Sequence, residues 1–67
     1  MPKKIRELKS MLKKAGFTSR PGKGSHTVWE HPLLSESVTL SGNDGRDARG
    51  YQERLVAQLL KELETRS

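Results

Sequence analysis

The chain has 67 residues, no cysteine and a formal net charge of +5 at pH 7. This length fits one domain, expected to span residues 1–67, and it excludes a deep cofactor cleft because such a domain buries only about 60% of its unfolded surface. The lack of cysteine excludes disulfides and thiolate metal ligands, and no apolar run resembles a signal peptide or membrane span, so we expect a cytoplasmic protein without membrane contact.

Positive charge is concentrated in the first half of the chain. Residues 1–34 contain eight Lys or Arg and two Glu, a net charge of +6, whereas residues 35–67 contain five Lys or Arg and six Asp or Glu, a net charge of −1. A basic half favours a polyanionic partner such as nucleic acid. The alternative is a solvated basic surface with no such partner.

The apolar spacing predicts a helix over residues 3–15, because Ile5, Leu8, Leu12 and Ala15 recur on one helical face, and Gly16 suits the position after its end. Strands are expected over residues 17–20, 25–30 and 36–40. Pro21 and Gly22 fit the central positions of a type II turn between the first two strands.

Residues 41–47 are rich in turn-forming residues and predict a loop, in which Asp44 or Asp47 could cap a second helix over residues 49–64. The apolar face of that helix is expected to be Tyr51, Leu55 and Leu59, with Val56, Leu60 and Leu63 beside it. The expected core consists of Ile5, Leu8, Leu12, Phe17, Trp29, Val38, Leu40, Tyr51, Leu55 and Leu59.

This order of elements predicts an α+β fold, α-β-β-β-α, with a three-stranded antiparallel sheet and both helices on one face. Strand alternation places Trp29 and Thr27 toward the core. It places His26, Val28 and Glu30 on the opposite face, which stays open to a ligand or partner.

His26 is the leading candidate for chemistry, because an imidazole can accept or give a proton near neutral pH. RNA supplies its own nucleophile, the 2′-hydroxyl, so a minimal site needs an acid or base and positive charge. Lys23 and Arg20, together with the backbone N–H groups of Gly22, Gly24 and Ser25, could bind the phosphate. The alternative is a solvated histidine without a role.

Other candidates favour structural roles. His31 precedes Pro32 and is interpreted as a turn residue, and two histidines five apart on a strand point to opposite faces, which argues against a shared metal. Trp29 is expected in the core rather than stacked on a base, and Ser25 lacks the context of a hydrolase nucleophile. We therefore expect neither a metal nor a cofactor.

Several motifs occur together in a family order. They are the run Leu12-Lys13-Lys14-Ala15-Gly16-Phe17, then Lys23-Gly24-Ser25-His26, then Trp29-Glu30-His31-Pro32. In these motifs the chain resembles the HicA family of toxins from bacterial type II toxin–antitoxin pairs. The resemblance implies a double-stranded-RNA-binding-domain-like fold and a ribonuclease that cleaves mRNA and arrests translation. It places the family's essential histidine at His26, and it implies a HicB-type antitoxin that covers the active surface.

Residues 41–54 depart from the family pattern, because common members carry a Pro/Lys-rich segment after the third strand. This departure suggests a divergent branch with altered recognition of substrate or antitoxin. Two other functions stay open: a non-catalytic RNA- or DNA-binding regulatory module of the same fold, and an interaction protein whose basic face binds an acidic partner.

Overall fold

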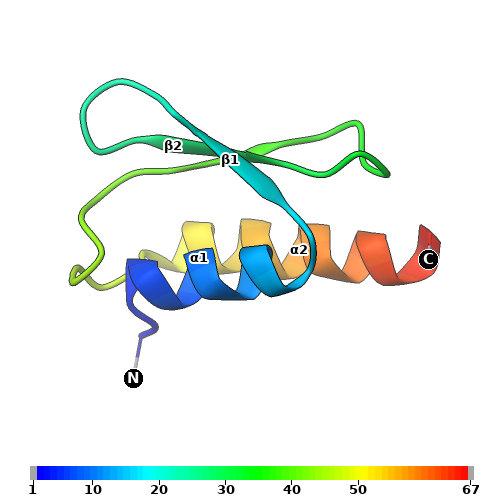
Figure 1. The fold of residues 1–67 in the computed structure, drawn as a ribbon. Coiled ribbons are helices and arrows are strands. Elements are labelled where there is room, and N and C mark those ends of the chain that lie inside the picture. Colours follow the sequence, from blue (N-terminus) through cyan, green and yellow to red (C-terminus); the bar gives the residue numbers. More distant parts are fainter. Residues whose placement is uncertain (1, 67) are drawn as a thin grey trace.

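The computed structural model describes residues 2–66. Two helices, α1 (Ile5–Lys14) and α2 (Gly50–Arg66), flank three strands, β1 (Thr18–Pro21), β2 (Thr27–Glu30) and β3 (Val38–Leu40). The strands form one antiparallel sheet in the order β1-β2-β3. Both helices cover the same face of this sheet (Figure 1). The predicted α+β fold, α-β-β-β-α, is confirmed. Within residues 2–66, no helix is long and apolar enough to cross a membrane.

Helix α1 ends in the way that its sequence predicts. Gly16 has a φ of +96°, and its N–H donates to the Lys13 carbonyl at 3.0 Å. The Phe17 N–H donates to the Leu12 carbonyl, also at 3.0 Å, and both of these side chains are buried. This is a Schellman motif with its apolar contact, so Gly16 both ends the helix and directs the chain into β1.

The loop between β3 and α2 caps the start of α1. The N–H groups of Ile5 and Arg6 donate to the carbonyls of Arg46 and Asp44, at 2.9 and 3.1 Å. Lys4, at the N-cap position, makes no side-chain capping bond. A helix leaves its first N–H groups without partners inside the helix, so carbonyls from a segment about 40 residues away in sequence satisfy two of them.

The core lies between the sheet and the helices. Trp29 of β2 stands opposite Val38 of β3, and its indole N–H donates to the Thr27 hydroxyl at 2.9 Å. The side chains expected in the core that are buried are Ile5, Leu8, Leu12, Phe17, Trp29, Val38, Leu40 and Leu59. Leu34, Ala48 and Val56 complete the buried apolar cluster.

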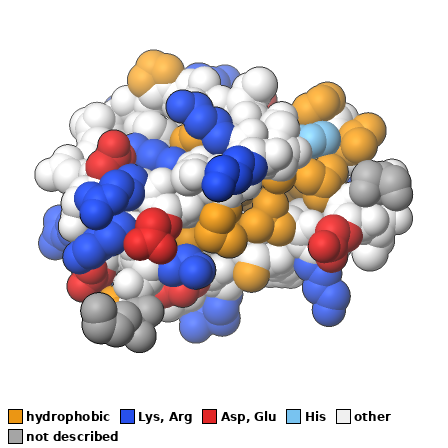
Figure 2. All heavy atoms as spheres, turned by 60° about the horizontal axis from the view of Figure 1, so that its bottom comes forward, with side chains coloured by type: hydrophobic (Ala, Val, Ile, Leu, Met, Phe, Trp, Pro, Cys, Tyr) orange, Lys and Arg blue, Asp and Glu red, His pale blue; other side chains and the backbone are white. Residues whose placement is uncertain are grey.

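The predicted inner face of α2 was correct at Leu59 and wrong at Tyr51 and Leu55. Tyr51 and Leu55 are 48% and 43% exposed, whereas Gln52 and Val56 are buried together with Leu59. The apolar spacing alone fits either stripe, the predicted one or the buried one. The buried stripe is hard to recognise in the sequence because it begins with the polar residue Gln52. The helical side of the molecule consequently presents apolar side chains in a band among charged ones (Figure 2).

Gln52 is buried because each end of its amide has a partner. Its amino group donates to the Ser41 carbonyl at 3.1 Å, and its carbonyl oxygen accepts the Arg49 N–H at 2.8 Å. The second bond is one half of a capping box. The expectation that Asp44 or Asp47 caps α2 was therefore wrong: their carboxylates pair with Lys9 and Lys4 of the α1 region.

We predict that Gln52→Ala lowers the free energy of unfolding by about 1–3 kcal/mol, because it leaves the Ser41 carbonyl and the Arg49 N–H without partners. Chemical denaturation measures this change. Gln58→Ala is the matched control, because Gln58 is an exposed glutamine on the same helix. Equal stabilities of the two variants would contradict the role of the Gln52 bonds.

Candidate active site

A tight turn fixes the backbone of His26. Its N–H donates to the Lys23 carbonyl at 3.0 Å, and its own carbonyl accepts the Gly22 N–H at 2.9 Å. Gly24 has a φ of +58° while Ser25 has no positive φ, which is the pattern of a type II′ turn. The predicted type II turn with Pro21 and Gly22 at its centre was wrong, because Pro21 still pairs with Thr27 inside the sheet.

The two glycines beside His26 are required for different reasons. A Cβ on Gly22 would lie 3.3 Å from the Cβ of His26 and from its carbonyl oxygen, so this position is sterically tight. A Cβ on Gly24 would meet nothing within 4 Å, and only its left-handed backbone favours glycine. The turn therefore holds His26 by backbone contacts and leaves its side chain exposed.

The side chain of His26 borders an open depression of about 430 Å³. The depression lies where the β1–β2 turn meets α1 and the β3–α2 loop. Its lining residues are Lys9, Pro21, Gly24, Ser25, His26, Thr27, Gly42, Asn43 and Asp44. Strand alternation does not place His26 on the open face with Val28 and Glu30, because β2 begins only at Thr27. His26 instead shares a surface with the helical layer.

Of the residues predicted to bind RNA, Gly24 and Ser25 lie in this depression with His26. The Ser25 hydroxyl oxygen accepts the Gly42 N–H at 3.2 Å, and its own hydrogen stays available to an acceptor. This bond also joins the β1–β2 turn to the start of the β3–α2 loop.

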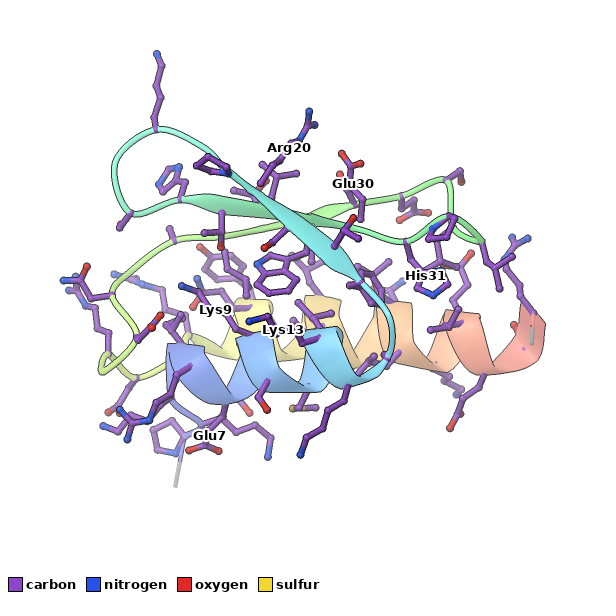
Figure 3. All side chains as sticks on the ribbon, viewed as in Figure 1. Glu7, Lys9, Lys13, Arg20, Glu30 and His31 are labelled. Carbon is purple, nitrogen blue, oxygen red and sulfur yellow. The ribbon has the colours of Figure 1, made fainter. Side chains whose placement is uncertain are left out.

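Arg20 and Lys23 do not line the depression. Arg20 lies on the outer side of the sheet, where it pairs with Glu30 at 2.9 Å (Figure 3). Lys23 is exposed in the turn. Their contact with RNA stays a prediction, and it would involve phosphates outside the depression.

The cation that does lie in the depression is Lys9 of α1. Its ammonium nitrogen is 2.6 Å from an Asp44 carboxylate oxygen, and its side chain is only 23% exposed. This hydrogen bond and the positive charge of Lys9 hold the pKa of Asp44 below its ordinary value, and Arg6 adds a smaller effect. This pair was not predicted from the sequence, because no local pattern connects residues 35 positions apart.

The second histidine has a structural role, as expected. His31 packs edge-on against Phe17 with ring centroids 5.2 Å apart, and its Nδ1 accepts the Leu33 N–H at 3.1 Å. Figure 3 shows it at the end of the molecule away from Lys9. His31 is therefore interpreted as part of the turn that follows β2.

Acidic groups do not converge. Among residues 2–66, no three His, Asp or Glu side chains are placed to hold a metal ion. What the depression offers is an exposed imidazole, an ammonium group that pairs with the Asp44 carboxylate, and a serine hydroxyl. Such a set can move a proton beside a bound anion.

The comparison with protein families agrees with the motifs. A family described as the HicA toxin of bacterial toxin–antitoxin matches residues 5–64. No curated protein and no solved structure gives a significant match. The matched span contains both helices up to Glu64, the whole sheet and the His26 depression. The chain belongs to the HicA family of bacterial toxins, which act in toxin–antitoxin pairs.

Proposed function

We propose that this toxin is a metal-independent endoribonuclease that cleaves mRNA, with His26 as its general acid or base. The observation that supports this proposal best is the exposed imidazole at the rim of a depression that also holds a cation. The chain also belongs to a toxin family. Cleavage of mRNA would arrest translation, which is an effect that suits a toxin.

The reaction follows from what RNA and the site each supply. The 2′-hydroxyl oxygen of the substrate attacks the adjacent phosphorus, and the bond to the 5′-oxygen of the next nucleotide breaks. His26 either removes the proton from the attacking oxygen or gives one to the leaving oxygen, and water carries out the other transfer, so that the leaving 5′-oxygen becomes a hydroxyl. Positive charge and the N–H groups of Gly24 and Ser25 stabilise the negative charge that develops at the phosphate. The Gly22 N–H, which was also expected to bind the phosphate, donates to the His26 carbonyl instead.

The proposed partner is a HicB-type antitoxin, which occludes His26 when the toxin is neutralised. Both helices cover one face of the sheet, and the other face is left open (Figure 1). Val28 is half-buried on that face beside exposed Arg20 and Glu30. To block RNA from the depression, a protein on this face must also extend over the β1–β2 turn, because the depression lies toward the helical layer.

We predict that His26→Ala lowers the rate of RNA cleavage by about 10²–10⁴-fold, because general acid–base catalysis contributes this much. The same change should abolish growth arrest. The control is His31→Asn, whose amide oxygen can still accept the Leu33 N–H, and it should cleave RNA at close to the unmodified rate. Near-normal cleavage by His26→Ala, in a nuclease-free preparation, would refute the assignment.

We predict that cleavage proceeds in excess EDTA and requires the 2′-hydroxyl. The assay compares RNA with a 2′-O-methyl RNA of the same sequence, with the chelator present throughout. RNA should be cut, whereas the methylated strand and DNA should stay intact. Activity that needs added magnesium, or equal cutting of the methylated strand, would contradict this mechanism.

We predict that binding of a HicB-type antitoxin protects the amides of residues 22–30 from hydrogen exchange. The comparison is between the free toxin and its purified complex. Protection confined to the exposed α2 positions around Tyr51 and Leu55, with residues 22–30 still exchanging freely, would show that inhibition does not work by occlusion.

A further inference from the structure

Two ion pairs join the β3–α2 loop to the α1 region, and they differ in their position. Lys4 pairs with Asp47, and Lys9 pairs with Asp44. Only the second pair borders the His26 depression. Asp47 instead faces a smaller hollow lined by Ser41, Arg49 and Gln52 among others.

The two members of the Lys9–Asp44 pair are held differently. The side chain of Lys9 is 23% exposed, whereas that of Asp44 is 64% exposed. The main chain of Asp44 is fixed, because its carbonyl accepts the Arg6 N–H. The Asp44 carboxylate can therefore rotate into solvent while the Lys9 ammonium group and the loop backbone stay in place.

The same pair also borders a second depression, of about 300 Å³, on the outer side of α1. Its other lining residues are Arg6, Ser10 and Lys13. The Lys9–Asp44 pair lines both depressions. An RNA strand that runs from His26 to the basic surface of α1 therefore passes over this pair. At that crossing the carboxylate occupies the place where Lys9 could bind a phosphate oxygen, because both anions accept charge-assisted bonds from an ammonium group.

We propose that Lys9 is a phosphate-binding residue of the His26 site, and that Asp44 is a built-in competitor which the RNA backbone must displace. This inference rests on the proposed function, since it assigns the phosphate to the same substrate. Asp44 lowers affinity in two ways: it neutralises Lys9 in the free protein, and it repels the phosphate after displacement.

The test measures binding of a fluorescent, single-stranded 2′-O-methyl oligoribonucleotide by anisotropy over a range of salt concentrations. Asp44→Asn and Asp47→Asn each remove one negative charge and one ion pair between the same loop and the α1 region. We expect Asp44→Asn to bind about two- to fivefold more tightly than Asp47→Asn, the range that corresponds to an exposed ion pair.

The lysines provide the complementary comparison. Lys9→Met should reduce the slope of log affinity against log salt by about 0.7, the loss of one phosphate contact on a single strand. Lys4→Met removes the same charge and is the matched control. In the Lys9→Met background, Asp44→Asn should give no gain beyond that of Asp47→Asn. A purely structural role for the pair would instead make Lys9→Met and Asp44→Asn change the affinity in the same direction, because either change breaks the pair.

The outcomes separate this inference from the proposed function, because binding is measured on a strand that cannot be cleaved through its 2′-oxygen. Equal effects of the Asp44 and Asp47 variants, or a gain from Asp44→Asn that persists without Lys9, would overturn the inference even if RNA is cleaved. Coupling between Lys9 and Asp44 in a protein that cleaves no RNA would support the phosphate contact and refute the ribonuclease.

Discussion

The arrangement of the site depends on the capping of α1 by carbonyls of the β3–α2 loop. The N–H groups of Ile5 and Arg6 would otherwise need water or a side chain, and Lys4 supplies no cap. By accepting these N–H groups, the loop fixes α1 against the end of β3. Gly42, at the start of the loop, in turn donates its N–H to Ser25 of the β1–β2 turn. Three segments that are distant in sequence thereby meet around His26.

Local signals were sufficient to predict the order of the elements. Gly16 ends α1 through its positive φ, and the alternation around Trp29 correctly identifies the buried side of β2. The inner face of α2 was not predictable in the same way, because its buried stripe begins with Gln52. A glutamine can be buried there only because Ser41 and Arg49 offer it partners, and these partners are a property of the tertiary structure.

The candidate site shows the same division between local and tertiary information. The Gly24-Ser25-His26 motif marks the imidazole, and the structure leaves that imidazole exposed beside two constrained glycines. The turn type was wrong, because proline was assigned to the turn whereas Pro21 remains in β1. The identity of the cation that lines the depression was also beyond local reasoning. Arg20 and Lys23 are close to His26 in sequence, but Lys9 shares its depression through contacts between α1 and the β3–α2 loop.

In the β3–α2 loop, the backbone makes the hydrogen bonds that support the fold, and the side chains make the ion pairs. Its backbone carbonyls cap α1, while its two carboxylates reach Lys4 and Lys9 on the surface. Exposed ion pairs contribute little to folding in water, whereas a helix start without partners is costly. The charges of this loop can therefore change without loss of the α1 cap. The charge that borders the His26 depression can in this way be altered while the fold that positions the imidazole stays the same.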